Sequence, residues 1–534
     1  MKKIIFFAFI VLTLFTGCKD KAFFELDRPV TNPWITLNDF DRAPIGAYNK
    51  IFSVGGYGDG YSTWYLYKNA EADDVSWLSA GDSWGYFRDS QSQKQFLPQV
   101  FTLSYQAICS VNDALQFVDD NNGNPYPNLS DNDKTNNLNR VIGELYFLRG
   151  FAYYELATVF CNADVPGGAN DSKQIPLLTK RASTYAEAIN TKVGTVKEVW
   201  AQIQSDFAKA YQLLPERYIA GKMNASYQAG RATKFAAAAM MARTYFAMGD
   251  YSNAKLQTDY VIDQNGGDFN LSEEPIQAFN KIVLGRGKEV IMYIPNYDQT
   301  TAQQMQLMGG FNSQRGNLVN TWNECNMEAG TLKRLGWLNN PTVDVNATFN
   351  MAALRDKRFT QLMTVREPAS VPVASQFPDR YYKDTRIKYT IVFANKAFRG
   401  APVGSNAAWY TNIPTIRLAE MYLTRSTCRL KAGDKLGAAS DLNIVRSRAW
   451  DATVAKQSYE SSDSYVTGSN ITEQMIGDER LIEMFCEGDR IDYLRGLKVD
   501  VGNGERGPGS IPYTDKGFVW AIPTTETDLN LGFH

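Results

Sequence analysis

The sequence predicts a mostly α-helical protein built from helical pairs, with one long loop-rich subdomain inserted between them. Apolar residues recur every three or four positions through most of residues 39–267, which is the spacing of helices that bury one face. A unit of helix, Gly-Asp turn and helix occurs twice along the chain. Residues 268–412, which lie between the two copies, lose this spacing and are rich in Asn, Gly and aromatic residues.

Composition indicates a packed core and excludes several kinds of site. Of the 534 residues 44% are hydrophobic, and 10 Trp, 29 Tyr and 29 Phe supply large apolar side chains. The 55 basic and 57 acidic residues nearly balance, so no nucleic-acid surface is indicated. The one histidine is the last residue, His534, although histidine is the usual general base and metal ligand. We therefore expect no metal site and no cofactor, which leaves carboxylate, lysine or backbone chemistry, or none.

The first residues have the pattern of a targeting segment. Two lysines precede an apolar run over residues 4–14 that is too short to span a bilayer. The sequence Phe-Thr-Gly then leads to Cys18, and small residues directly before a cysteine are typical of a bacterial lipoprotein signal. We expect cleavage after residue 17 and a lipid anchor on Cys18. An ordinary secretory signal cut nearby, with Cys18 incidental, is the alternative.

The other five cysteines show no disulfide framework or metal-binding pattern. They are an odd number, widely spaced, without a Cys-x-x-Cys pair. We expect buried small apolar residues, although one bridge could form. These cysteines are Cys109, Cys161, Cys325, Cys428 and Cys486.

Two helices of the first part have clear boundaries. The strongest pattern runs from Arg140 to Phe160, and Pro166 ends the segment. Its apolar stripe consists of Val141, Leu145, Leu148, Ala152, Leu156 and Val159. A second helix begins at the capping box Thr195–Glu198, includes Trp200 as a core residue, and stops at Pro215.

The repeated unit predicts two helical pairs of the same design. Glycine can adopt the left-handed conformation that ends the first helix, aspartate can cap the second, and a small alanine lets the helices approach closely. This arrangement is typical of tetratricopeptide-like helix-turn-helix repeats. The copies are Phe235–Met248 with Gly249, Asp250 and Tyr251–Ile262, and Ile416–Lys431 with Gly433, Asp434 and Lys435–Val445; Ala254 corresponds to Ala438.

The segment between the copies reads as a loop-rich subdomain. Its strand-like pieces are residues 290–294 and 389–393. Long loops on a rigid scaffold are where binding residues usually lie.

Several sequence blocks, taken in order, resemble the SusD/RagB family, whose members are surface lipoproteins over SusC-type TonB-dependent transporters. The resemblance covers the whole chain and includes the lipoprotein signal. The blocks are Asp164-Val165-Pro166 followed by Ile175–Leu178, Tyr245–Asp250, Ile416–Leu423 with Asp441–Arg446, Glu479–Glu483 with Glu487–Asp492, and Ile522-Pro523 with Leu529-Asn530. The chain departs from the family pattern at Ile491, where an aromatic residue is common, and in its last five residues.

The resemblance implies a SusD-like fold and a division of the chain. We expect a signal peptide over 1–17, a tether over 18–38, a first scaffold part over 39–267 with a ligand loop at 69–90, an insertion over 268–412, and a C-terminal scaffold part over 413–534.

Three carboxylates near the C-terminus, Glu479, Glu483 and Glu487, would lie on one face of a helix. Paired carboxylates carry out glycoside hydrolysis, but acids on one helix are poorly placed to flank both faces of a sugar ring. We expect instead a charge network with Arg480, Arg490 and Arg495 that ties the last helices to the scaffold.

Ligand residues are expected in the 69–90 loop and in the insertion. Sugars have flat apolar faces bordered by hydroxyl groups, so a site needs aromatic platforms beside polar side chains. The resemblance places ligand contacts in these same two regions. The candidate platforms are Trp77, Trp84 and Tyr86, the edge contacts are Asp73, Asp74 and Arg88, and the insertion contributes Tyr297 and Trp322. Core packing is the alternative for each aromatic residue, and we expect it for the run Trp64–Tyr67.

By resemblance, the function is a binding function without catalysis. We expect a lipid-anchored protein on the exterior of the outer membrane that captures oligosaccharides as the lid of a SusC-like transporter. A lid that binds peptides is the first alternative, and a surface glycosidase is the second.

Overall fold

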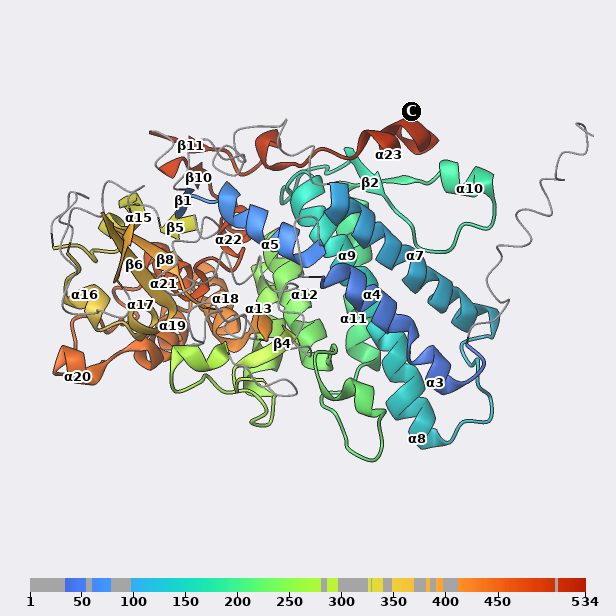
Figure 1. Cartoon of the computed structure of the whole chain (residues 1–534), viewed down its shortest axis with the longest axis horizontal. Helices are drawn as coiled ribbons and strands as arrows, with labels where there is room; N and C mark the ends of the chain where they lie inside the picture. Colours follow the sequence, from blue (N-terminus) through green and yellow to red (C-terminus); the bar gives the residue numbers. More distant parts are fainter. Residues whose placement is uncertain are drawn as a thin grey trace, which may run out of the picture.

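The computed structural model describes residues 34–53, 60–77, 98–279, 286–295, 325–327, 329–339, 348–368, 381–384, 390–396, 412–504 and 508–534. In Figure 1 the helices α3 to α11 gather at one end of the molecule, and α15 to α21 and the main sheet lie towards the other, while the last helix, α23, lies over the first end. The prediction of a mostly α-helical fold is confirmed. Within the described residues, no helix combines the length and apolar character needed to cross a membrane.

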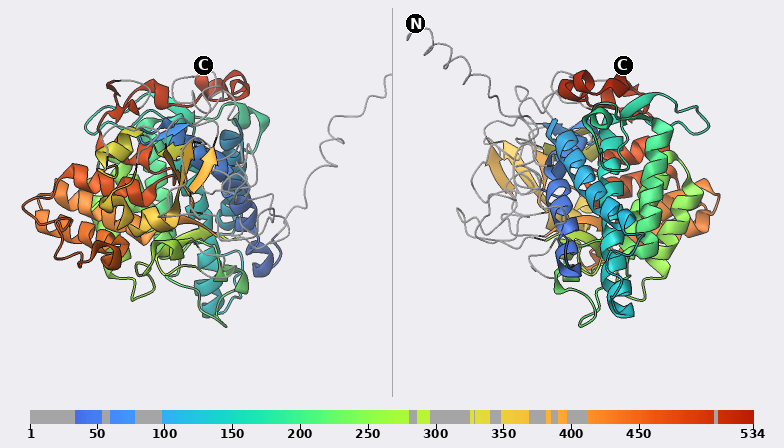
Figure 2. Two further views of the ribbon diagram at one scale, coloured as in Figure 1. Left: turned by 60° about the vertical axis from the view of Figure 1, so that its left-hand side comes forward. Right: turned by 90° about the vertical axis from the view of Figure 1, so that its right-hand side faces the viewer.

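Helix α9 (Asn139–Phe160) is the centre of the first part. It packs against α4 (Ala43–Ile51), α7 (Pro98–Asp120) and α11 (Val196–Leu213), which lie side by side in Figure 2. The sequence predicts one buried stripe, but α9 is buried on nearly every side because neighbours surround it. Several of its buried charged side chains have partners on neighbouring helices: Arg149, for example, donates to Asp206 at 2.9 and 2.7 Å.

Helix α11 begins where its capping box predicts. The Thr195 side chain accepts a hydrogen bond from the Glu198 backbone N–H, and the Glu198 carboxylate accepts one from the Thr195 N–H. Leu214 ends the helix just before Pro215. Trp200 is buried in the core, as predicted, and so are Trp64 and Tyr65 of α5 (Gly60–Glu71).

Both copies of the repeat form helical pairs. The first is α12 (Lys234–Met248) with α13 (Tyr251–Asp263), and the second is α18 (Leu418–Lys431) with α19 (Lys435–Ala449). Gly249 and Gly433 have φ of +79° and +83°, and the side chains of Asp250 and Asp434 cap the following helices. Helix α13 packs against α18, so the two pairs are neighbours in space.

The second pair begins two residues later than the sequence predicts. Ile416 lies in strand β9 (Ile413–Arg417), which pairs with β4 (Val290–Ile294). The strand occupies these positions because its backbone hydrogen bonds go to β4, and that partner is distant in the sequence.

The main sheet has the strand order β1-β5-β8-β6-β7. Its strands β6 and β7 are parallel, and the other neighbours are antiparallel. The predicted strand pieces at 290–294 and 389–393 correspond to β4 and β8. The bounds are β1 Val75–Trp77, β5 Cys325–Met327, β6 Met363–Pro368, β7 Tyr381–Asp384 and β8 Ile391–Ala394.

Shorter elements are found in the rest of the described structure. The small strand pairs are β2 (Lys173–Pro176) with β3 (Val193–Thr195), and β10 (Val501–Gly502) with β11 (Ser510–Ile511). The remaining α-helices are α3 Leu37–Phe40, α8 Asp131–Asp133, α10 Tyr185–Ile189, α15 Ala329–Arg334, α16 Met351–Leu354, α17 Lys357–Leu362, α20 Ala452–Ala455, α21 Glu473–Met484, α22 Arg490–Leu497 and α23 Thr524–Leu529.

The cysteines differ in their exposure. Cys161, Cys428 and Cys486 are buried, as expected of small apolar residues. Cys109 is exposed, so the expectation of burial is wrong there. It lies on the outer side of α7, while the apolar residues of that helix, such as Ile108 and Val111, face α9 and α4. The side chain of Cys325 lies outside the described part of the structure.

Candidate functional site

The two regions predicted to bind ligand meet in the main sheet. Strand β1 continues directly from the start of the 69–90 loop, and β5 belongs to the insertion. The strands are antiparallel, with Val75 opposite Met327 and Trp77 opposite Cys325. The chain therefore leaves β1 after Trp77 at the same end of the sheet at which it enters β5.

Asp73 fixes the start of this loop to the C-terminal part of the chain. Its carboxylate accepts hydrogen bonds from Arg490 Nε at 2.7 Å and from Arg490 Nη2 at 3.0 Å. Burial raises the pKa of the Asp73 carboxyl, but the hydrogen bonds and charge of Arg490 outweigh it and hold that pKa below its usual value. The two side chains form a bidentate ion pair, which also fixes the orientation of the guanidinium.

Asp74, the next residue, has different surroundings from Asp73. It is 3% exposed, and its Oδ1 accepts no hydrogen bond within the described residues. Burial, reinforced by the charge of Asp73, raises the pKa of Asp74 to about 7. This carboxyl therefore changes its charge near neutral pH, directly beside the first residue of β1.

Two further contacts hold the end of α5 against α22 and the segment that leads into it. Lys68 forms a buried ion pair with Asp492. The Gly488 backbone N–H donates to Asn69 Oδ1 at 2.8 Å. Gly488 has φ of +71°, and a Cβ there would lie 3.0 Å from the Tyr65 carbonyl oxygen, so the chains approach closely only with glycine at this position.

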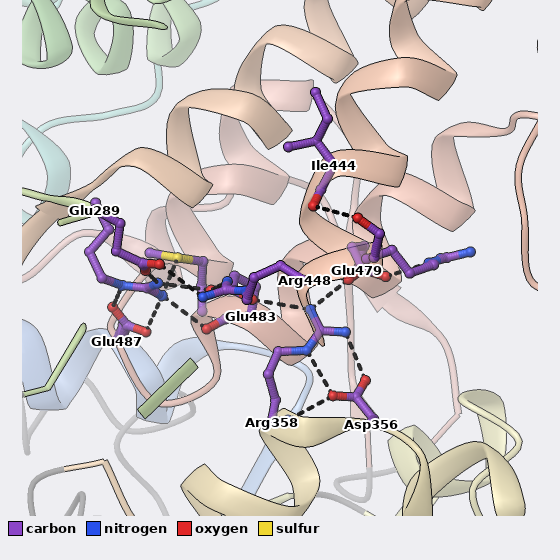
Figure 3. A network of polar contacts seen from close by, with 12 residues as sticks. Glu289, Asp356, Arg358, Ile444, Arg448, Glu479, Glu483 and Glu487 are labelled. Atoms are coloured by element: carbon purple, nitrogen blue, oxygen red, sulfur yellow. Dashed lines mark hydrogen bonds and ion pairs between the residues drawn. The ribbon is translucent and has the colours of Figure 1, made fainter. Parts of the chain in front are cut away.

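Glu479 and Glu483 of α21, together with Glu487 just after that helix, lie in a buried charge network (Figure 3). Glu483 accepts hydrogen bonds from Arg417 Nη1 at 2.8 Å and Arg448 Nη2 at 2.6 Å. The same carboxylate pairs with Arg358 at 3.1 Å. Burial raises the pKa of Glu483, but the three arginines outweigh it and lower that pKa well below its usual value.

The neighbouring glutamates have similar surroundings. Glu479 pairs with Arg358 and Arg446 at 2.5 and 2.7 Å. Glu487 pairs with Arg417 at 2.6 Å and Lys396 at 2.5 Å. The carboxylates of Glu479 and Glu483 are buried, and their arginine partners hold the pKa of each below its usual value, so neither has the raised pKa of a general acid.

A charge network is confirmed, but its partners are not the ones predicted. Arg480 binds Asp489 at 2.7 and 2.6 Å, and Arg490 binds Asp73. Arg495 donates to the Thr158 carbonyl oxygen at 2.9 Å. The glutamates of α21 pair instead with arginines of α17, β9 and α19. The network therefore joins the insertion to the C-terminal scaffold.

Most predicted ligand residues lie outside the described residues. These are Trp84, Tyr86, Arg88, Tyr297 and Trp322, and the predicted anchor Cys18 as well. Trp77 is placed through its backbone in β1, and its side chain is outside the described part. Asp73 and Asp74 are placed fully. Sequence reasoning missed Arg490 as the partner of Asp73, because the two are far apart in the chain and no local pattern links them.

Within the described residues, no group of three or more His, Cys, Asp or Glu side chains could hold a metal ion.

Two family models match the chain. One, described as starch-binding and associating with the outer membrane, matches residues 47–246. The other, described as the SusD family, matches residues 288–496. SusD-like protein P2 of Formosa agariphila is 23% identical over 411 residues, which cover 74% of this chain and 73% of that protein.

Solved structures share the fold. A SusD superfamily protein of Bacteroides thetaiotaomicron has a TM-score of 0.69 at 22% identity, covering 93% of this chain and 99% of its own. A SusD-like carbohydrate binding protein of Bacteroides vulgatus has a TM-score of 0.67 at 17% identity, with coverage of 93% and 97%. Another of that description, from Bacteroides fragilis, has a TM-score of 0.66 at 19% identity, with coverage of 94% and 99%.

Proposed function

The chain belongs to the SusD/RagB family, and from this premise we propose that it is a nutrient-binding lipoprotein that captures oligosaccharides at the outer-membrane surface. Proteins of the same fold that are described as carbohydrate binding support the choice of ligand. The observation that carries the proposal is the pairing of β1 with β5, because it joins the start of the aromatic-rich loop to a strand of the insertion in one sheet.

The proposed site extends from that end of the sheet. Trp77, Trp84 and Tyr86 would stack on sugar rings, and Tyr297 and Trp322 would contribute from the insertion. Asp73, Asp74 and Arg88 are the proposed edge contacts. Because Arg490 engages Asp73 and because Asp74 is buried, a direct contact from either carboxylate requires this segment to rearrange on binding.

The proposed mechanism is capture and delivery. Cys18 would carry the lipid anchor, and the protein would cover the outer mouth of a SusC-like TonB-dependent transporter as a hinged lid. Ligand bound at the β1–β5 end would be enclosed when the lid closes and then handed inward. The arginine pairing of Glu479, Glu483 and Glu487 supports a structural role for these acids, which fits a protein that binds without catalysing.

A binding screen tests the proposal. The mature chain with Cys18→Ala would be applied to a glycan array and, in parallel, to a peptide pool, and hits would be measured by calorimetry. Oligosaccharide binding that leaves the ligand unshortened is the expected result. Binding of peptides alone would favour the peptide lid, and shortened saccharide products would show an enzyme; either result contradicts the proposal.

A further inference from the structure

A hollow of about 230 Å³ lies between the insertion and the C-terminal scaffold. None of its lining residues belongs to the predicted ligand set. Its walls come from the end of α15 and the segment after it, from α16, α17 and the residues between them, from α19 and the segment after it, and from α21. Its volume is below the roughly 300–1,000 Å³ of sites for drug-sized ligands, so it suits a ligand with one ring rather than an oligomer.

Two tryptophans give this hollow an apolar wall. Trp337 packs edge-on against Phe359, with ring centroids 5.3 Å apart. Trp450 donates from Nε1 to the Gln457 carbonyl oxygen at 3.0 Å, which fixes its ring plane. Both indoles are thus held rigidly before any ligand arrives, which lowers the entropy cost of binding.

The charged side chains of the hollow neutralise one another, with one exception. Arg358 binds Asp356 and Glu479, and Arg446 binds Glu479 as well. Arg334 forms an ion pair with Asp478. These contacts leave no acid of the lining without a basic partner.

Arg355 is the exception. Its guanidinium lies over the Trp450 ring, 4.4 Å from the centroid, and Nη2 donates to Ser464 Oγ at 2.8 Å. Among the described residues no carboxylate lies within ion-pair distance of it. Asp356 and Asp463 act on it only through space. A half-buried cation held on an aromatic ring, with donors to spare, is a binding group for an anion.

We propose that this hollow binds the carboxylate of a single sugar-acid ring, such as a uronate, through Arg355, with the ring against the Trp337 and Trp450 wall. The preference for a sugar over other carboxylates rests on the proposed function. The preference for a carboxylate follows from the Arg355 guanidinium, which has no carboxylate partner in the described part of the chain and offers a planar pair of N–H donors.

Calorimetric titration of the mature chain with glucuronate tests the proposal, with glucose and acetate in parallel. Glucuronate should bind and glucose should not, because the two differ at the carboxylate. Acetate should bind more weakly, because it lacks the ring. No binding of glucuronate, or acetate binding as tightly, would overturn the proposal.

Variants locate the binding. Arg355→Gln should weaken glucuronate binding roughly 10- to 100-fold, the range expected for loss of charged hydrogen bonds. The glucuronate affinity of Arg355→Lys should lie between those of wild type and Arg355→Gln, since lysine keeps the charge but cannot stack as a planar group on the Trp450 ring. The control Arg181→Gln removes an exposed arginine and should leave binding unchanged. Glucuronate affinity that is unaffected by both Arg355 variants would show that the site lies elsewhere.

The proposed function and the inference about the hollow can be tested independently of each other. Binding of a neutral oligosaccharide should be the same in wild type and in Arg355→Gln, because that ligand is assigned to the β1–β5 end. If neutral oligosaccharides bind and glucuronate does not, only the inference about the hollow is wrong.

Discussion

Trp77 in β1 lies opposite Cys325 in β5, although nearly 250 residues separate them in the sequence. The strands are only three residues long, yet they join the first part of the scaffold to the insertion. Together with the Asp73–Arg490 ion pair, this pairing ties the start of the predicted ligand loop to two distant parts of the chain.

The register predicts a disulfide. Opposed residues of an antiparallel pair have Cα atoms roughly 4.5–5.5 Å apart, within the roughly 4.4–6.8 Å that a disulfide spans. Trp77→Cys should therefore bond to the native Cys325 under mild oxidation, which peptide mapping by mass spectrometry would detect. Ser76→Cys is the matched control, because neighbouring residues of a strand point to opposite faces. A bond from position 76 and none from position 77 would contradict the register.

The aromatic platforms give a second prediction. Trp77→Ala combined with Trp84→Ala should abolish oligosaccharide binding in calorimetry, since each stacked ring contributes on the order of 1 kcal/mol or more. The thermal midpoint should change little if the rings serve the ligand. Trp200→Ala is the contrast: this core residue should lower the midpoint sharply. A large stability loss in the double variant would mark Trp77 and Trp84 as core residues.

Helices were predictable because their signals are local. The capping box at Thr195 and the glycine turns at Gly249 and Gly433 need only adjacent residues, and the structure has them where expected. The burial of α9 on all sides was not predictable from periodicity. Its charged residues, such as Arg149, are buried against partners like Asp206 that no local pattern identifies.

In the candidate site, too, features set by local sequence were predictable and features set by distant contacts were not. Composition alone pointed to the region beginning at Asp73, because it interleaves aromatic and short polar residues. Arg490 and the β1–β5 register depend on contacts between distant segments, and so do the partners of Glu483. Three-residue strands carry too little alternation to be recognised in a sequence.

The anchor prediction is tested by fractionation. Cys18→Ala removes the thiol that would be lipidated, so the protein should move from the membrane fraction to the soluble fraction. Exposed Cys109→Ala is the control and should stay with the membranes. Unchanged membrane association of Cys18→Ala would contradict the lipoprotein assignment.

Asp74 predicts a specific pH dependence of stability. Its pKa is about 7 in the folded chain, against about 4 in an unfolded one. Protonation is therefore favoured by folding: the stabilising contribution is complete below about pH 4 and is lost as the pH rises to about 7. At about 1.4 kcal/mol per pKa unit the loss could reach about 4 kcal/mol.

Denaturant titrations from pH 4 to 8 would measure this contribution. Asp74→Asn cannot ionise, so its free energy of unfolding should fall less over this range than that of wild type. Asp73→Asn is the matched comparison and should be destabilised at neutral pH, because it leaves Arg490 without its charged partner. Parallel pH curves for wild type and Asp74→Asn would refute the assignment of a titrating carboxyl at this position.

A Glu483 variant distinguishes a structural role for this carboxylate from a catalytic role. The carboxylate compensates three buried arginines, and removing one member of such a network leaves charge uncompensated at a cost of roughly 3–5 kcal/mol. Glu483→Gln should therefore lower the thermal midpoint by several degrees. Glu460→Gln changes an exposed glutamate of the same part of the chain and should leave the midpoint within about a degree. Where the folded fraction of Glu483→Gln persists, it should bind oligosaccharide as wild type does, because the side chain of Glu483 is buried. A variant of full stability that lost binding or turnover would instead place Glu483 in the functional site.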